Sequence, residues 1–249
     1  MLKKKIDAGV YEPLNSSYQL CWFCVMKKDS KALCSIHSLK PLNKVMIQHS
    51  GVVPIPEHLA EQFGGYVHGG MLNLYVAFNE RKVAESSHDL RTFQTPFSAL
   101  RIVTLPMGWT NSVPIMYNDV TYILQPKILH ITIPYINYAP IKGLKLHYQL
   151  SNGVFKTIPD NPTIRHFIWE HLKNLNCIVQ HMKYCGGTFS GPKLFLCIPE
   201  ITVLGHQCNI DRHMADPTRI DVISKWGPCN SPTEVKVFLR TIGVCHIFI

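Results

Sequence analysis

The fold class of this chain is most readable in the stretch ITIPYINYAPIKG, residues 131–143. Apolar residues lead into Asn137-Tyr138 and lead away from it, which is the pattern of two short strands that meet at a turn. Hairpin tips are a common place for catalytic groups, yet an amide and a phenol are poor candidates for chemistry. The stretch predicts a hairpin, and it leaves open whether that hairpin is purely structural or a site without its reactive groups.

Length and composition favour an ordered domain that is rich in turns. Of the 249 residues, 46% are hydrophobic and 16% are charged. The charged fraction lies below the usual value of about 25%, which argues against disorder. The 17 Pro and 15 Gly argue against a helical bundle. The formal charge of +9 favours phosphate-bearing partners, although a merely basic protein would show the same charge.

No targeting or membrane segment is evident in the sequence. The N-terminal residues MLKKKIDAGVYEPLNSSY contain no apolar stretch after the lysines, so they do not form a signal peptide. No run of about 18 apolar residues exists, so no membrane partner is expected. We therefore expect an intracellular protein, in the cytoplasm or nucleus, that is not secreted. Its nine cysteines are then expected to be reduced thiols.

The sequence contains two groups of cysteine and histidine residues that could bind a metal. Cys21 and Cys24 form a C-x-x-C pair, but no second pair follows at the spacing of a zinc site. Cys177, His181 and Cys185 recur every four residues, which places them on one helix face. A metal site on that face is one interpretation, and core thiols are the preferred one.

Helix and strand signals mix without regular βαβ alternation, which predicts the α+β class. Turn and cap residues place the elements. We expect strands at 19–26 and 33–37, a helix from Pro56, a strand at 69–78, a helix at 112–128, a hairpin turning at Asn152-Gly153, a helix from Pro162 to Gly186-Gly187, two strands within 193–210, and a tail helix capped by Ser231 with Glu234.

Six separated motifs, in one order, resemble the reverse transcriptase domain of gypsy-type LTR retrotransposons. KKDSKALCSIHSLKPLN (27–43) is similar to the fingers motif of that family. MLNLYVAF (71–78) is similar to the palm strand with the first catalytic aspartate. TFQTPFSALRIVTLPMGWTNSVPIMYNDV (92–120) is similar to the segment with the Pro-x-Gly loop and the helix under the template.

The other three motifs follow. ITIPYINYAPIKG matches the position of the Tyr-x-Asp-Asp hairpin, and GTFSGPKLFLCIPEITVLGH (187–206) resembles the next palm strands with the primer-gripping Leu-Gly-His. DPTRIDVISKWGPCNSPTEVKVFLRTIGVCHIFI (216–249) resembles the thumb, with Trp226 and Pro228 at its entry. The resemblance covers essentially the whole chain and implies a degenerate copy of a Metaviridae-like pol polyprotein fragment.

The resemblance implies a right-hand polymerase fold with fingers, palm and partial thumb. It implies a domain order along the chain: fingers at 1–48, palm at 49–81, fingers again at 82–116, palm at 117–213 with a peripheral hairpin near 143–162, and the start of the thumb or connection at 214–249. It also implies RNA-directed DNA synthesis by two-metal nucleotidyl transfer on an RNA or DNA template-primer, with deoxynucleotides as substrates and Mg²⁺ as cofactor.

The positions of the three metal-binding aspartates of the family hold Asn73, Asn137 and Tyr138. Magnesium prefers anionic oxygen ligands, whereas an amide and a phenol are uncharged at pH 7. No metal is therefore expected to bind at these positions as encoded, and catalysis should be lost. Asp119 and Glu80 are the nearest alternative acids along the sequence, and we expect neither to replace the missing ones.

At other positions of the family's motifs, this sequence has either lost or kept the residue that the family uses. Cys34 stands where the family has an arginine for the triphosphate, and a thiol cannot make a bidentate phosphate contact. Ser30 and Ser98 replace glycines, and Arg240 replaces the glycine of Phe-Leu-Gly. The resemblance assigns roles to the following residues: Lys28, Cys34, Lys40, Phe78, Pro106 and Gly108 in substrate binding, Lys193 in catalysis, and Leu204, Gly205 and His206 in the primer grip.

Several of these residues have simpler interpretations. Phe78, which would be the gate against ribose 2′-hydroxyls, could be a core aromatic. Lys193 and the basic turn around Lys28 could be solvated lysines. For the whole chain, two alternatives to an inactive reverse transcriptase remain: a non-catalytic nucleic-acid-binding module, and a pseudogene product without a selected role.

Overall fold

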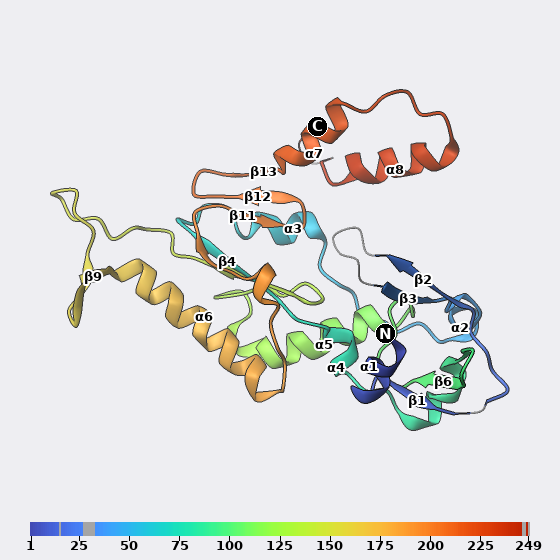
Figure 1. Cartoon of the computed structure of the whole chain (residues 1–249). Helices are drawn as coiled ribbons and strands as arrows, with labels where there is room; N and C mark the ends of the chain where they lie inside the picture. Colours follow the sequence, from blue (N-terminus) through green and yellow to red (C-terminus); the bar gives the residue numbers. More distant parts are fainter. Residues whose placement is uncertain (15, 27–32, 246–247, 249) are drawn as a thin grey trace. The chain divides into compact units, whose positions relative to one another are not determined.

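The fold is described from a computed structural model, which describes all residues except 15, 27–32, 246, 247 and 249 (Figure 1). The chain divides into two compact units, and each unit is discontinuous in sequence. Unit 1 comprises Met1–Val52 and Tyr75–Val120, and unit 2 comprises Val53–Leu74 and Thr121–Ile249. The mixture of helices and antiparallel strands agrees with the α+β class.

Unit 1 contains a three-stranded antiparallel sheet and a separate hairpin. The sheet has the order β1-β6-β5, and β2 pairs with β3 in the hairpin. Edge-to-face contacts join Phe93 to Tyr11, Trp22 and His37, which gives this unit an aromatic core. The elements are β1 (Tyr11–Pro13), β2 (Trp22–Met26), β3 (Leu33–His37), β5 (Thr92–Gln94), β6 (Ala99–Ile102), α1 (Leu2–Asp7), α2 (Lys40–Val45), α4 (Ala77–Glu80) and most of α5 (Ser112–Leu124).

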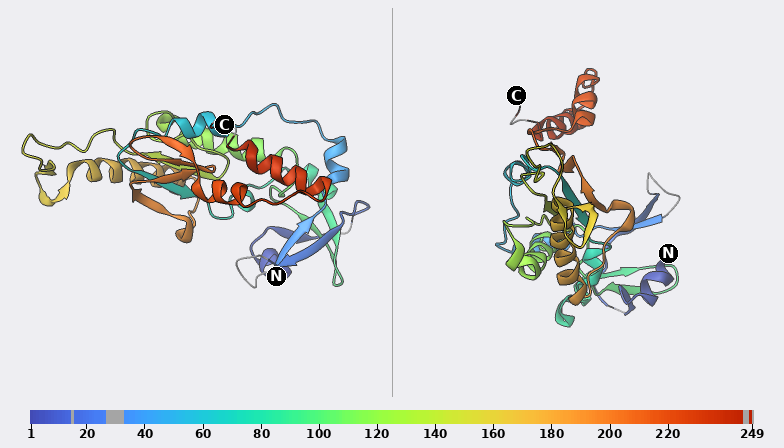
Figure 2. Two further views of the ribbon diagram at one scale, coloured as in Figure 1. Left: turned by 90° about the horizontal axis from the view of Figure 1, so that it is seen from above. Right: turned by 90° about the vertical axis from the view of Figure 1, so that its left-hand side faces the viewer.

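Unit 2 is built around the antiparallel sheet β10-β4-β7. The long helix α6 contacts β10 and β7, and the β8–β9 hairpin lies at its N-terminal end (Figure 2). A second sheet has the order β11-β12-β13. The elements are β4 (Gly69–Asn73), β7 (Tyr138–Lys142), β8 (Thr157–Ile158), β9 (Asn161–Arg165), β10 (Phe195–Ile198), β11 (Ile201–Val203), β12 (His206–Cys208), β13 (His213–Ala215), α3 (Pro56–Glu61), α6 (His166–Tyr184), α7 (Pro217–Ser224) and α8 (Pro232–Gly243).

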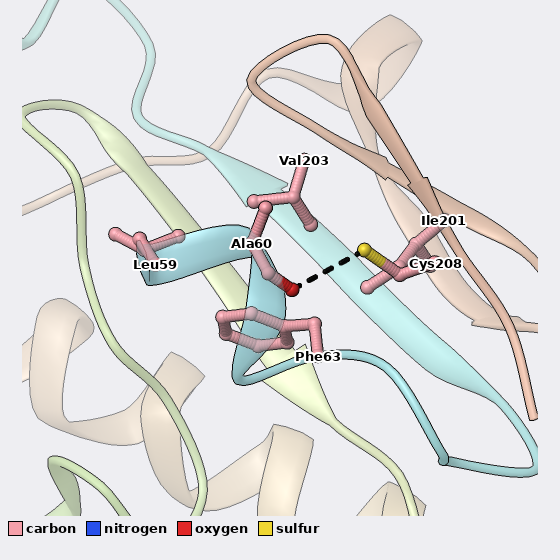
Figure 3. Packing of buried hydrophobic residues seen from close by; sticks show 6 residues of the cluster. All are labelled: Leu59, Ala60, Phe63, Ile201, Val203 and Cys208. Carbon is pink, nitrogen blue, oxygen red and sulfur yellow. Dashed lines mark hydrogen bonds between the residues drawn. The ribbon is translucent and has the colours of Figure 1, made fainter. Parts of the chain in front are cut away.

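A cluster of buried residues joins α3 to β11 and β12 within unit 2 (Figure 3). Phe63 is 2% exposed and Val203 is 1% exposed. The thiol of Cys208 donates to the carbonyl oxygen of Ala60 at 3.4 Å. Burial raises the pKa of Cys208 to about 12, so this thiol keeps the proton that it donates. The cluster therefore combines apolar burial with a satisfied polar group.

The prediction that a helix begins at Pro162 is wrong. Residues 161–165 form β9, which pairs with β8, and α6 begins only at His166. The Asn161 side chain accepts a hydrogen bond from the Thr163 backbone N–H, a local bond that competes with helix formation. The C-terminal prediction is confirmed, because Gly186 has a φ of 80° directly after the cap residue Cys185.

The strand expected at 69–78 is too long. Strand β4 ends at Asn73, Val76 adopts a left-handed φ of 44°, and helix α4 follows. Two strands were expected within 193–210, and three are present. The 22–37 hairpin, the helices from Pro56 and Ser112, and the tail helix are confirmed. Ser231 caps α8 by accepting from the Glu234 backbone N–H.

None of the helices in the described part of the chain is long and apolar enough to cross a bilayer.

Replacing Phe63 with alanine should destabilise unit 2, because the ring is 2% exposed within the buried cluster. The expected loss is about 3–5 kcal/mol of unfolding free energy, measured by urea denaturation. Phe97, which is 90% exposed, supplies the matched control. Phe97→Ala should change stability by less than about 0.5 kcal/mol. Equal losses in the two variants would contradict the packing described for Phe63.

Candidate active site

The pairing of β4 with β7 brings Asn73, Asn137 and Tyr138 together at one end of the central sheet. Asn73 lies opposite Tyr138 in the antiparallel register. The Leu74 backbone N–H donates to the Asn137 carbonyl at 2.9 Å. Residues from motifs far apart in the sequence are thereby joined at one place within unit 2.

The centre of this site is a pair of neutral amides. Asn137 Nδ2 donates to Asn73 Oδ1 at 3.5 Å. Asn73 is 4% exposed, and its Nδ2 has no hydrogen-bond partner among the described residues. A buried N–H without an acceptor costs about 1–3 kcal/mol. The position therefore holds an amide with a donor in excess, whereas a carboxylate would have no donor to satisfy.

The turn of the hairpin lies one residue earlier than expected. Tyr135 and Tyr138 exchange two backbone hydrogen bonds of 2.8 and 2.9 Å, so the two turn residues are Ile136 and Asn137. Tyr138 is the first residue of β7, which corrects the prediction of a tip at Asn137-Tyr138. The incoming arm is held by isolated bridges, such as Thr132 to Ile141, rather than by a regular strand.

Ile136 has a φ of 57°, in the left-handed region that glycine and asparagine normally occupy. A β-branched residue is strained there, at a cost of about 1–3 kcal/mol. The pairing of β4 with β7, which begins directly after the turn, must hold Ile136 in this left-handed conformation. The backbone at the tip is therefore set by the sheet rather than by the preference of its own residues.

The side chains at this site do not fit a pair of magnesium ions. Mg²⁺ is normally held by carboxylates in near-octahedral geometry. Here the oxygens belong to two amides and a phenol, and Asn73 Oδ1 already accepts from Asn137. None of the three side chains supplies a negative charge at pH 7.

The alternative acids occupy positions in unit 1. Asp119 Oδ2 forms an ion pair with Arg81 Nε at 2.9 Å, which commits that carboxylate to a partner. Glu80 is the last residue of helix α4, beyond the end of β4, as the sequence suggested. Neither residue belongs to the unit that contains Asn73.

A cleft of about 270 Å³ in unit 1 brings Cys34 and Pro106 together. Lys5 also lines this cleft, and its Nζ donates to the Tyr11 hydroxyl at 3.0 Å and to Ser35 Oγ at 3.2 Å. Lys5 has no distinctive sequence pattern, because it lies within an N-terminal basic run. In the structure it is a cation that lines the cleft beside Cys34.

The other predicted substrate-binding residues lie on separate elements of unit 1. Phe78 is half-buried in α4, and Lys40 is exposed at the start of α2. Gly108 has a φ of 90°, and its carbonyl accepts from Asn43 Nδ2 at 2.9 Å, so α2 supports the Pro-x-Gly loop. Lys28, with the basic turn around it, and Ser30 lie outside the described residues.

In unit 2, Leu204 and Gly205 form the turn between β11 and β12, with φ values of 52° and 90°. The positive φ of Gly205 favours glycine, and a Cβ there would also displace the end of the Arg219 side chain, which lies 2.7 Å away at Nε. His206 is fully buried, near His213 and Phe248. Burial lowers the pKa of His206, which favours the neutral ring.

Lys193 ends a short 3₁₀ helix (Gly191–Lys193) and is exposed. This geometry is open to both interpretations of Lys193.

The two cysteine groups selected from sequence form no three-ligand cluster in the described residues. Cys21 and Cys24 are exposed thiols. The Cys177 thiol lies 3.8 Å from His181 Nδ1, which is itself 2.8 Å from the Cys177 carbonyl oxygen. Cys185 is exposed beyond the helix end. A Cys177–His181 pair therefore exists, without a third ligand.

Known relatives of the chain occur among retroviral polyproteins. The chain is 24% identical over its full length to the Gag-Pol polyprotein of woolly monkey sarcoma virus, and 24% identical to that of gibbon ape leukemia virus. It spans 14% of the length of each polyprotein. No protein-family model matches the chain.

Solved structures of the foamy viral protease-reverse transcriptase have a similar fold. The structure in complex with an RNA/DNA hybrid gives a TM-score of 0.79 over 97% of this chain and 29% of that chain, at 16% identity. The structure in complex with double-stranded DNA gives 0.78 over 97% of this chain and 46% of that one. The chain thus has a reverse transcriptase-like fold and resembles a retroelement pol region. These relatives are retroviral, so they do not single out the gypsy-type group.

Replacing Ile136 with glycine should leave stability unchanged or raise it by up to about 1 kcal/mol, because glycine adopts a positive φ without strain. Thermal and urea unfolding would measure this change. Ile115, which is half-buried in α5, supplies the matched control. Ile115→Gly should lose at least about 1 kcal/mol. A larger loss at Ile136 than at Ile115 would show that the turn is not strained.

Proposed function

We propose that this chain is the reverse transcriptase-like region of a retroelement pol protein that binds nucleic acid but no longer supports efficient two-metal nucleotidyl transfer. The observation that carries this proposal is the amide pair at the end of β4, where Asn137 Nδ2 lies 3.5 Å from Asn73 Oδ1. The proposal rests on the fold shared with the foamy viral enzyme, whose solved structures include nucleic-acid complexes.

In this proposal, the central sheet of unit 2 is the palm and much of unit 1 is the fingers. The helices α7 and α8 begin the thumb, where Trp226 packs on Phe238 with ring centroids 5.3 Å apart. The Leu204-Gly205 turn would present backbone to a primer, while buried His206 would support that turn by packing. We further propose that the retroelement is of the gypsy type.

The loss of activity follows from the energetics of the missing metals. Each metal of a two-metal site stabilises the transition state by several kcal/mol, and each 1.36 kcal/mol is a factor of about ten in rate. Neutral amides cannot hold two divalent ions close together against their mutual repulsion. Cys34 adds a second deficit, because a thiol in the unit 1 cleft cannot clamp a triphosphate.

A second candidate function is a nucleic-acid-binding module without chemistry. The formal charge of +9 and the exposed Lys40 of α2 favour it. Binding through phosphates would persist without the catalytic acids, because that binding depends on lysine and arginine rather than on metals.

Restoring the acids tests the proposal directly. The unaltered chain should give no detectable primer extension on an RNA template with Mg²⁺ or Mn²⁺. The triple variant Asn73→Asp/Asn137→Asp/Tyr138→Asp should extend the primer, and adding Cys34→Arg should increase the yield. Product formation would be measured on a denaturing gel.

Asn73→Asp alone is the matched control for this experiment, and it should remain inactive because one carboxylate cannot organise two metals. Robust synthesis by the unaltered chain would overturn the proposed loss of catalysis. Inactivity of a folded quadruple variant that still binds template-primer would argue against the assignment of these positions.

Binding to a labelled template-primer should weaken steeply with salt if phosphates dominate the contact. Each neutralised phosphate contributes about 0.9 to the slope of log K against log salt on duplex DNA. Lys40→Ala should therefore reduce that slope by about one. Lys183→Ala, at an exposed lysine in the last turn of α6, is the control and should leave the slope unchanged. Filter binding that shows no salt dependence would exclude the binding module.

A further inference from the structure

A second group of chemically capable side chains lies in unit 2, at the other end of β4. His68 directly precedes β4, His171 lies in α6, and Cys197 lies in β10. One ring nitrogen of each histidine and the Cys197 Sγ all lie within 4.8 Å of one another. Asn73 ends the same strand, roughly 17 Å away at the rise of an extended chain. This group is therefore separate from the amide pair.

The imidazole of His68 is buried without a hydrogen-bond partner. The residue is 4% exposed, and neither of its ring nitrogens has a partner among the described residues. Its ring meets the ring of His171 edge-on, with centroids 4.4 Å apart and an interplanar angle of 89°. A buried polar ring without a partner costs free energy, which a bound ligand would recover.

The fold positions His171 as a metal-ligating histidine is usually positioned. His171 is fully buried, and its Nε2 lies 2.6 Å from the Leu196 carbonyl oxygen. A proton on Nε2 makes this contact a hydrogen bond and leaves Nδ1 with a free lone pair. Nδ1 makes no hydrogen bond of ordinary geometry in the described structure, although burial lowers the pKa of the ring and a backbone contact to Lys142 acts to raise it. Such a bond from the second nitrogen to a backbone carbonyl fixes the tautomer of a ligating imidazole.

Close backbone packing holds His68 in place. A Cβ added to Gly143 would overlap the carbonyl oxygen of His68, so only glycine allows the chain after β7 to pass this closely. Cys197 lies in β10 between Phe195 and Ile198, which pair with Met71 and Gly69 of β4 on either side of a register irregularity. The three residues thus come from a helix, from a strand, and from the position directly before the neighbouring strand, so regular elements of the fold support the ligand site.

We propose that His68, His171 and Cys197 form a site for a divalent transition metal, with Zn²⁺ as the ion that fits best. Two imidazole nitrogens and one thiolate are ligands of borderline softness, which suit Zn²⁺ better than Mg²⁺ or Ca²⁺. Ligand atoms in a tetrahedral zinc site are roughly 3.3–3.8 Å apart, so the three groups must close by about 1 Å. Water or another ligand would take the fourth position.

Protonation competes with the metal at this site. Burial raises the pKa of the Cys197 thiol, so a metal must displace its proton. Burial, His171 and His147 lower the pKa of His68 to about 4, so its ring is neutral at pH 7.

The test uses Co²⁺ as a spectroscopic substitute for Zn²⁺ on the metal-free full chain. Titration should give one equivalent with a thiolate-to-cobalt absorption band and the visible bands of four-coordinate Co²⁺, and added Zn²⁺ should remove them. Cys197→Ser should weaken Co²⁺ binding by about 100-fold or more and abolish the thiolate band. Cys177→Ser is the matched control, because Cys177 is also half-buried beside a histidine, and it should keep the band.

A second measurement needs no variant and remains decisive if Cys197→Ser fails to fold. Zn²⁺ should slow the alkylation of Cys197 in the unaltered chain at least tenfold, as followed by peptide mass spectrometry, and should leave Cys177 unaffected. Absence of a stoichiometric thiolate band, an unchanged band in Cys197→Ser, or equal protection of both cysteines would overturn the proposal. The outcome does not depend on nucleic-acid binding or polymerisation.

Discussion

The antiparallel pairing of β4 with β7 is the constraint on which both ends of unit 2 depend. At one end it sets Asn73 against Tyr138 and imposes a left-handed backbone on Ile136. At the other end it pairs Gly69 with Lys142, so that Gly143 passes against the carbonyl of His68. One register therefore places both the amide pair and His68 of the histidine–cysteine cluster, because a slip of one residue would reverse the face of every side chain.

The sheet places two amides together where carboxylates would carry negative charge. Clustered carboxylates repel one another without metals, whereas two amides can share a hydrogen bond. The amide pair avoids the repulsion between two carboxylates. Its own cost is smaller, and it comes from the Asn73 Nδ2, which has no hydrogen-bond partner in the described structure. The backbone hydrogen bonds of the strands do not depend on the identity of these side chains, so the fold tolerates amides at these positions.

Elements with strong local signals could be predicted from sequence, and tertiary effects could not. Ser231 caps the start of α8 and Gly186 follows the end of α6, as the cap chemistry of these residues predicts. Pro162 misled because β9 pairs with β8, a contact that no local pattern encodes. The hairpin at 131–143 was found, but its tip was misplaced by one residue, since Ile136 has no preference for the turn conformation. Lys5 and the His68 cluster were missed because their partners are distant in sequence.

The hydrogen bond between Asn73 and Asn137 makes the two positions unequal toward an acid. An aspartate at position 73 alone would accept from the Asn137 amide N–H, whereas an aspartate at position 137 alone would face the Asn73 Oδ1. Aspartates at both positions would place two carboxylates within hydrogen-bond distance, where like charges repel until a cation is bound. The effect of an acid at one position thus depends on the residue at the other, so the two positions are epistatic.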